Sequence, residues 1–186
     1  MANWWTDLDA LHHEIWKQLE RGVAEPTSPA RHPVLATEGT TGGGEARLVV
    51  LRAASREDAL LEVHTDTASA KVGELAREPR ATLLIWDSTS RIQLRLRARA
   101  EIRKGQGAAV VWSRIPARSR AVYGGTPMPG KAIAAPEDFV GHADPARFAV
   151  VTAHIHEIDA LHLGEDMHRR AIFRAEDNWH GQWVAP

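Results

Sequence analysis

The segment from Ile92 to Arg103 constrains the fold more than any other part of the sequence. Apolar side chains at every second position alternate with Gln, Arg and Glu side chains, and four of these polar residues are arginines. A period of two is that of a β-strand with two different faces. Twelve residues exceed the usual strand length, and a strand this long often bends around a barrel. We therefore predict a long strand with one apolar and one basic face.

Other segments show the same period or a helical one. The predicted strands are 34–37, 46–52, 60–64, 82–86, 147–158 with a possible continuation to 163, 170–175 and 179–184. The predicted helices are 7–21, capped by Thr6 and ended by Gly22, then 68–77, 106–115 and 117–123. Glycines 42–44 and the pair Asp177-Asn178 are expected to form hairpin turns. Many strands without a βαβ rhythm predict a mostly β, α+β domain built on an antiparallel barrel, spanning 1–186.

Composition excludes several classes of function. The chain of 186 residues has no cysteine, which rules out disulfides, thiolate nucleophiles and cysteine-based zinc sites. Its net charge of −1 gives no reason to expect nucleic acid or a membrane surface as partner. No signal peptide opens the sequence, and no apolar run is long enough to span a membrane. We expect a soluble, cytoplasmic protein.

Two arginines bracket the apolar strand predicted at 46–52. Arg47 and Arg52 have the geometry that binds phosphate, but odd and even positions of a regular strand face opposite sides. They can reach one ligand only if the ligand wraps the strand end or the strand contains a bulge. Otherwise both arginines face solvent.

A second candidate anion site lies where a strand ends and a helix begins. The stretch 64–71 places Thr65, Ser69 and Lys71 near the free N–H groups of a helix start, which favour an anion. The alternative is ordinary capping by Asp66 or Thr67, with Lys71 in solvent. On the basic strand, the Gln93 amide suits the polar edge of a flavin ring, or is simply exposed.

Taken in order, these motifs resemble the pyridoxamine 5'-phosphate oxidase family. The matching stretches are R-L-V-V-L-R at 47–52, H-T-D-T-A-S-A-K at 64–71, E-L-A-R-E-P-R-A at 74–81, R-I-Q at 91–93 and H-R-R at 168–170. The resemblance covers about residues 5–186. It implies a Greek-key split β-barrel with flanking helices, which binds flavin mononucleotide (FMN) at the interface of a homodimer.

The resemblance also implies which residues contact the cofactor. They are Arg47, Val49, Val50, Arg52, His64, Thr65, Ser69 and Lys71, joined by Gln93 and Arg170, which we expect from the partner subunit. The first eight line the flavin or hold its phosphate.

The family's substrate pattern is only half present. Arg114, Ser119 and His168 match substrate contacts, whereas Asp166 replaces an arginine and Val110 a tyrosine. We therefore expect an FMN-dependent oxidoreductase related to the vitamin enzyme, acting on a small molecule, with no catalytic residue assigned. The alternative is a flavin or heme carrier without turnover.

The ten histidines raise the question of a metal site. His154 and His156 share one strand face, a spacing that can chelate a metal. No Asp, Glu or His completes a recognisable ligand set. We therefore interpret the pair as part of a polar strand face and predict no metal.

Overall fold

The computed structural model describes residues 4–186, so the first three residues of the predicted domain lie outside the described part. Its strands are β1 (Val34–Glu38), β2 (Gly44–Leu48), β3 (Leu51–Ser55), β4 (Leu60–Asp66), β5 (Arg80–Asp87), β6 (Ile92–Lys104), β7 (Phe148–Leu163), β8 (His168–Arg174) and β9 (Gly181–Val184). Its α-helices are α1 (Leu8–Ala24), α2 (Ala70–Arg77), α3 (Ala109–Arg114) and α4 (Ala117–Arg120). Short 3-10 turns occupy Trp4–Thr6, Pro29–Arg31, Gly105–Ala108, Pro136–Asp138, Pro145–Arg147 and Ala175–Asp177.

The strands form one curved, open sheet in which neighbouring strands run antiparallel. Their order is β2-β1-β5-β6-β7-β4-β3, with β8 beside the second half of β7 and β9 beside β8. Because β4 and β8 pair with different halves of β7, the sheet splits there rather than closing. The predicted mostly β class and split barrel are confirmed.

The long strand β6 lies at the centre of the hydrophobic core. Ile92, Leu94 and Leu96 are fully buried, and a register shift between Arg97 and Ala98 bends the strand against β7. A β-bulge of this kind increases curvature, which lets one strand serve both halves of the barrel. The predicted long, two-faced strand is confirmed.

Carboxylates on the neighbouring strands neutralise much of the basic face of β6. Arg95 pairs with Asp159 and Arg103 with Glu62, while Arg97 lies 3.1 Å from Glu157. The basic strand face is therefore part of an ion-pair ladder across the sheet.

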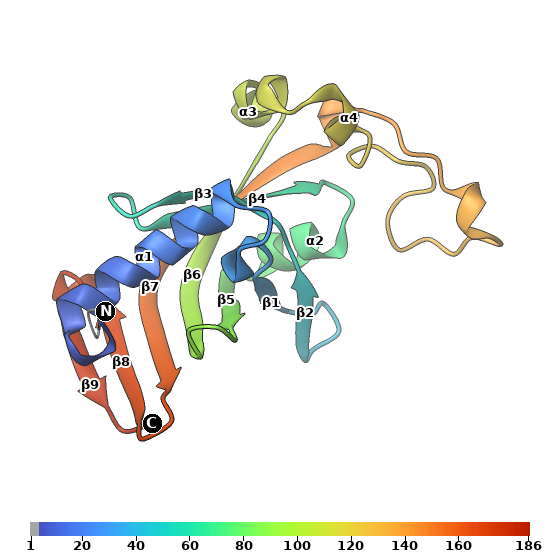
Figure 1. Cartoon of the computed structure of the whole chain (residues 1–186). Helices are drawn as coiled ribbons and strands as arrows, with labels where there is room; N and C mark the ends of the chain where they lie inside the picture. The colour runs from blue at the N-terminus through green and yellow to red at the C-terminus, as the bar shows by residue number, and fades with distance from the viewer. Residues whose placement is uncertain (1–3) are drawn as a thin grey trace.

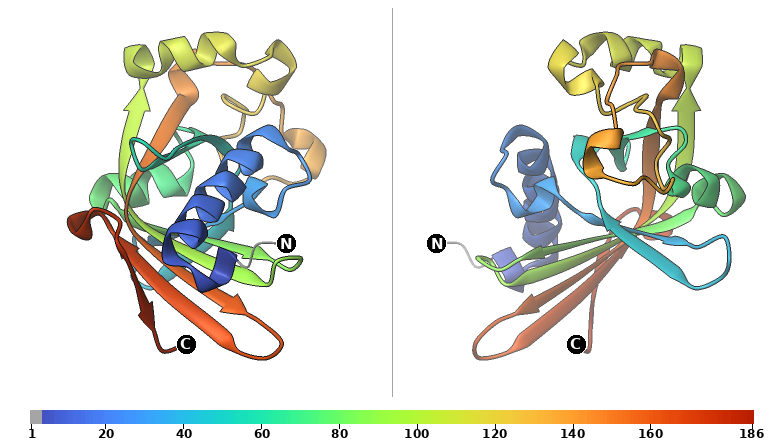
Figure 2. Two further views of the ribbon diagram at one scale, coloured as in Figure 1. Left: turned by 60° about the vertical axis from the view of Figure 1, so that its left-hand side comes forward. Right: turned by 90° about the vertical axis from the view of Figure 1, so that its right-hand side faces the viewer.

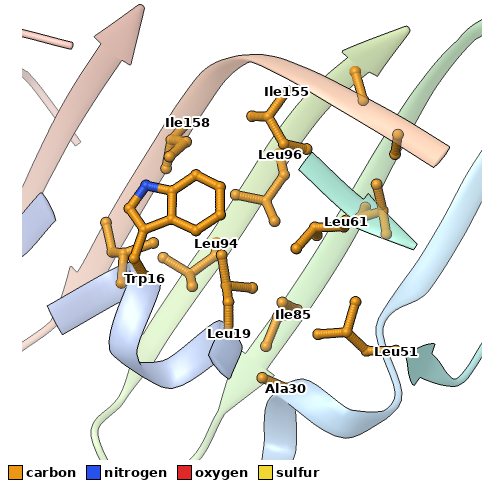
Figure 3. Packing of buried hydrophobic residues seen from close by; sticks show 14 of the residues in the cluster. Trp16, Leu19, Ala30, Leu51, Leu61, Ile85, Leu94, Leu96, Ile155 and Ile158 are labelled. Carbon is orange, nitrogen blue, oxygen red and sulfur yellow. The ribbon is translucent and has the colours of Figure 1, made fainter. Parts of the chain in front are cut away.

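Helix α1 covers the apolar face of the sheet (Figure 2). Trp16 and Leu19 point from the helix toward Leu94 and Leu96 of β6 (Figure 3). Asp7, and not Thr6, is the N-cap, because its carboxylate accepts the Ala10 N–H at 2.7 Å. The expected stop at Gly22 is also wrong.

Gly22 lies within α1, and the segment that follows the helix packs directly on it. A Cβ at this position would lie 2.7 Å from the carbonyl carbon of Ala30. The glycine is required for close approach rather than for helix termination, and the helix continues to Ala24.

The predicted strand 46–52 is two strands rather than one. The chain leaves β2 after Leu48, and the Val49 N–H donates to the Pro33 carbonyl at 3.0 Å before β3 begins at Leu51. The pairing of β3 with β4 then shifts register between Leu51 and Ala53. Arg47 and Arg52 therefore belong to different strands.

Several predicted boundaries also move. Helix α2 begins at Ala70, and the predicted helix 106–115 is a 3-10 turn followed by α3. The predicted helix 117–123 ends at Arg120. The optional continuation of the strand to residue 163 is present in β7, and Asn178 has the left-handed φ of 51° that its turn requires.

Two structural extensions lie at opposite ends of the long pair β6–β7. Figure 1 shows α3 and α4 at one end, and β8 and β9 at the other. Beyond α4, an extended segment projects from the barrel and doubles back through a bridge between Thr126 and Val140. No helix in residues 4–186 is long and apolar enough to cross a membrane.

Candidate functional site: a cationic cluster and a separate pocket

Thr65, Ser69 and Lys71, here called the Lys71 cluster, gather between the end of β4 and the start of α2. The Lys71 ammonium donates to the Thr65 hydroxyl at 3.1 Å and to the Ser69 hydroxyl at 3.2 Å. The two hydroxyls lie 2.9 Å apart. Ser69 is the N-cap residue of α2, yet its side chain makes no capping hydrogen bond. One cation and two hydroxyls thus converge at a helix start.

The electrostatics of this cluster suit an anion. Burial lowers the pKa of Lys71, and the nearby Arg47 lowers it further, against weaker opposing effects of Glu74 and Asp66. Within residues 4–186, no carboxylate lies within ion-pair distance of the Lys71 ammonium. A half-buried cation that donates only to neutral hydroxyls gains most from a phosphate, which accepts several charge-assisted hydrogen bonds.

Arg47 contacts a neighbouring carboxylate as well as β1. Its guanidinium lies 2.8 Å from the carboxylate of Glu74 and also donates to the hydroxyl of Thr37. The Thr37 hydroxyl in turn donates to Glu74 at 2.6 Å. Arg47 is thus held on the inner side of the β1–β2 hairpin, close enough to Lys71 to affect its charge.

Asp66 ties the Lys71 cluster to distant parts of the chain. This buried carboxylate accepts the N–H groups of Ala68 at 2.7 Å and Gly124 at 2.9 Å. It also accepts two hydrogen bonds from the Arg147 guanidinium, at 3.0 and 2.7 Å. One side chain therefore connects β4, the approach to α2, the projecting segment and the approach to β7.

A separate pocket, here called the α3–α4 pocket, opens beside β3 and β4. It has a volume of about 260 Å³, and its lining residues are Arg52, His64, Val111, Arg114, Ile115, Pro116, Ser119 and Tyr123. Because side chains alternate along a strand, His64 and Thr65 face different sides of β4. The structure therefore places Arg52 and His64 with Arg114 and Ser119 rather than with Lys71.

The polar lining of the α3–α4 pocket carries two positive charges, from Arg52 and Arg114, and His64 adds no third. Burial, Arg52 and Arg103 lower the pKa of His64 to about 4, so its imidazole is neutral at pH 7. Burial raises the pKa of Tyr123, and the nearby Arg52 partly opposes this effect. Among the described residues, neither Arg52 nor Arg114 forms an ion pair with a carboxylate.

Gln93 and Arg170 lie on the outer face of the sheet, away from α1. Register places Trp86, Gln93, Leu161 and Arg170 side by side across β5, β6, β7 and β8. No contact joins Gln93 or Arg170 to the Lys71 cluster within the described chain.

A buried carboxylate fixes the orientation of Arg170. Asp159 accepts from this guanidinium at 3.0 and 2.8 Å and pairs with Arg95 as well. Burial alone would raise the pKa of Asp159, but hydrogen bonds from Arg170 and Arg95 lower it below its usual value.

His168 lies far from the other predicted substrate residues. It lines a groove of about 310 Å³ together with Met167, Arg169, Arg170 and Trp183. His168 pairs with Leu163, whereas His64 pairs with Val150 near the other end of β7. Thirteen residues of extended strand separate these positions by roughly 40 Å. One chain does not bring His168 together with Arg114 and Ser119.

The two valines of the first motif differ in exposure. Val49 is a member of the buried core, so its side chain faces inward, while Val50 is half-buried. Of these two side chains, Val50 is the one with a surface left for a ligand.

Several residues of these sites could not be identified from the sequence. Tyr123 is the only tyrosine of the chain, yet it stood merely at the end of a predicted helix. Glu74, Thr37 and Arg147 gave no local signal, because their partners are distant in sequence. Within residues 4–186, no group of three or more His, Asp or Glu side chains gathers as a metal site, and His154 lies near Glu101 at 3.5 Å.

An open antiparallel barrel with a cationic cluster at the start of α2 defines a split-barrel protein suited to a phosphorylated cofactor. Residues 13–104 match the family described as pyridoxamine 5'-phosphate oxidase, FMN-binding domain. The first half of the chain is thus a pyridoxamine 5'-phosphate oxidase-related, FMN-binding domain, whose cofactor is FMN. A comparison with curated proteins finds no match.

Solved structures support the same fold. A pyridoxamine 5'-phosphate oxidase-related, FMN-binding protein from Nostoc punctiforme is 22% identical, with a TM-score of 0.74, over 100% of this chain and 98% of that one. PhzG from Burkholderia lata, in complex with tetrahydrophenazine-1-carboxylic acid, is 18% identical, with a TM-score of 0.77 and the same coverage. A heme-binding protein from Mycobacterium smegmatis is 20% identical, with a TM-score of 0.51, over 87% of this chain and 58% of that one. At these identities the likeness establishes the fold.

Proposed function

We propose that this protein is an FMN-dependent oxidoreductase that acts on a small anionic substrate as a homodimer. The observation that carries the proposal is the Lys71 cluster, in which a half-buried ammonium donates to two hydroxyls and has no carboxylate partner in the described chain. This donor set fits the phosphate of FMN.

The residues of the Lys71 cluster would hold the cofactor phosphate. Lys71 supplies charge, Thr65 and Ser69 supply hydroxyl donors, and Arg47 lies close enough to add a second cation. Val50 would border the ring. When bound, FMN supplies the capacity to accept and donate hydride or single electrons.

The α3–α4 pocket would take the anionic end of the substrate. In the described part of the chain Arg52 and Arg114 have no carboxylate partner, and Ser119 and Tyr123 offer hydroxyl donors. Neutral His64 adds a hydrogen-bonding group without a third positive charge. Such a set binds and orients a carboxylate or a phosphate beside apolar walls.

A second copy of the chain would complete the site. Gln93, Arg170 and His168 lie on the outer face or the far end of the sheet, where they cannot reach the Lys71 cluster of their own chain. Apolar side chains accompany them on that face, including Leu48 at 68% exposure and Trp86 at 47%. Burying these side chains against a partner removes apolar surface from water and brings the two half-sites together.

A carrier without turnover is the second candidate function. It is favoured by the departures from the family's substrate pattern, because Val110 is 63% exposed and does not line the α3–α4 pocket. The likeness to a heme-binding protein adds heme as an alternative cargo. A visible spectrum separates flavin from heme, and turnover separates an enzyme from a carrier.

Flavin binding tests the cofactor assignment. Titration of FMN and of riboflavin, which lacks the phosphate, gives two dissociation constants by quenching of flavin fluorescence. We expect Lys71→Met to weaken FMN by roughly 10- to 100-fold, since it removes charge-assisted hydrogen bonds worth about 1.5–3 kcal/mol. Riboflavin affinity should stay the same, as should both affinities in Lys104→Met, which removes an exposed lysine. Equal FMN binding by wild type and Lys71→Met would refute the phosphate assignment.

Turnover is tested on the FMN-loaded protein. Reduction of the flavin by a nicotinamide, followed by its reoxidation by a small carboxylate or phosphate ester that accepts the electrons, supports the enzyme. A flavin that no nicotinamide reduces supports the carrier.

A further inference from the structure

Glu74 is a buried carboxylate beside the Lys71 cluster that the proposed function does not use. It lies on α2 and is 4% exposed. Its Oε2 atom is 2.8 Å from the Arg47 guanidinium and accepts the Thr37 hydroxyl at 2.6 Å. Burial of a carboxylate is costly unless it is paired, and Arg47 provides that pairing.

The pairing directs both ends of the Arg47 fork away from a ligand. One terminal nitrogen binds Glu74, and the other donates to Thr37 and lies 3.5 Å from the Leu35 carbonyl. The Arg47 side chain is 22% exposed. A phosphate therefore meets an Arg47 whose Nη1 donors are both engaged and whose Nη2 is shared with Glu74.

Glu74 also changes the charge that a phosphate encounters. Arg47 and Lys71 contribute two positive charges, and the buried carboxylate of Glu74 cancels one of them. Glu45 also lies 4.0 Å from Arg47, but its side chain is exposed, so solvent screens its charge. Asp66 also acts on Lys71, but its effect is smaller than that of Glu74, and Arg147 pairs with its carboxylate. Lys71 senses both Arg47 and Glu74, so the three groups act on one small volume.

We propose that Glu74 is a positioning residue that acts as an internal counter-anion of the cofactor-phosphate site. It holds Arg47 in place and lowers the affinity of the site for FMN. This inference rests on the proposed function, which places the FMN phosphate at the Lys71 cluster. Glu74 competes with the phosphate for Arg47 and repels it across the cluster. The phosphate consequently adds less to flavin affinity than two free cations would provide.

The decisive variant is Glu74→Gln, which removes the charge but keeps the length and an oxygen that accepts from Thr37 and Arg47. The probes are FMN and riboflavin, titrated against the purified full-length protein. We expect FMN affinity to rise about tenfold in Glu74→Gln, which corresponds to about 1.4 kcal/mol. Riboflavin affinity should change less than about twofold on the same scale. A merely structural role for Glu74 would change both affinities together.

Glu38→Gln is the matched control. Its carboxylate lies in the same corner of the barrel but pairs at the surface with Arg77 at 3.1 Å. We expect it to leave both affinities unchanged, because solvent screens an exposed charge. Glu74→Met, an apolar side chain of similar length, is the second variant, and it carries the same expectation as Glu74→Gln if the amide folds poorly.

The outcomes separate this inference from the proposed function. Wild-type protein that binds neither flavin refutes the proposed function and this inference with it. Wild-type protein that prefers FMN over riboflavin by more than about 100-fold refutes the inference alone, since charge-assisted hydrogen bonds of about 1.5–3 kcal/mol from each of two cations would then be realised. An FMN to riboflavin ratio that does not rise in Glu74→Gln or Glu74→Met also refutes it.

Discussion

Asp66 is the residue whose loss should most disturb the candidate site, and its contacts give the expected size of the effect. Asp66→Ala removes the acceptor of four hydrogen bonds, from Ala68, Gly124 and twice from Arg147. Arg147, whose side chain is 20% exposed, is then left without its counter-ion. Removing one partner of a buried ion pair costs about 3–5 kcal/mol. For a chain of this length each kcal/mol lowers the melting temperature by about 2–4 °C, so we expect a decrease of roughly 6–20 °C.

Thermal unfolding followed by circular dichroism measures this decrease, and Asp138→Ala is the control. The Asp138 carboxylate also accepts backbone N–H groups, from Ala134 and Ala135 at 3.0 Å each, but it lies at the exposed surface of the projecting segment. Its loss should cost at most about 1 kcal/mol. If Asp66→Ala melts within 2–3 °C of Asp138→Ala, on the scale of about 2–4 °C per kcal/mol, the view of Asp66 as the central anchor is wrong.

Two further predictions concern acid stability and assembly. Burial lowers the pKa of His12 from 6.5 to about 4, so on acidification the unfolded chain binds a proton here before the folded chain does. The contribution of neutral His12 to the free energy of unfolding is therefore fully present above pH 6.5. It should decrease by up to about 3 kcal/mol as the pH falls to 4. Urea unfolding across this pH range should show that the free energy of unfolding depends less on pH in His12→Gln than in the wild type. His13→Gln, which changes an exposed neighbour, should have the pH dependence of the wild type. Equal pH dependence in His12→Gln and the wild type would contradict the assignment. Trp86→Glu should convert a dimer to a monomer in light scattering, whereas Ala76→Glu, an exposed helical position, should not; an unaffected dimer would place the interface elsewhere.

The architecture could be predicted because its signals are local. Alternation along 92–103 depends only on which residues share a face of one strand, and the structure retains it clearly from Ile92 to Arg99 and more weakly beyond. The same holds for α1, whose helical period survived although both of its ends were misplaced. The C-terminal end was misplaced because Gly22 is needed for close packing against Ala30, a contact that a helix pattern does not encode.

The division of the motif at 47–52 could not be predicted. A regular strand would put Arg47 and Arg52 on opposite faces, and the sequence offers no sign of where the ladder breaks. The Val49 N–H still bonds the Pro33 carbonyl in the register of β1 and β2, and the break comes after it, where β3 pairs with β4 from Leu51 onward. This change of partner strand separates the two arginines into two chemical environments, one beside Glu74 and one beside Tyr123.

In the stretch 64–71, Asp66 both caps the local backbone and binds groups that are distant in sequence. Capping by Asp66 was the ordinary explanation for this segment, and Asp66 does accept the nearby Ala68 N–H. The same carboxylate also binds Arg147, 81 residues away, and the N–H of Gly124, 58 residues away. Because Asp66 pairs with Arg147 there, Lys71 has no carboxylate partner among residues 4–186. The unpaired state of Lys71, on which the proposed phosphate site depends, is therefore a product of tertiary contacts that a local reading of residues 64–71 does not contain.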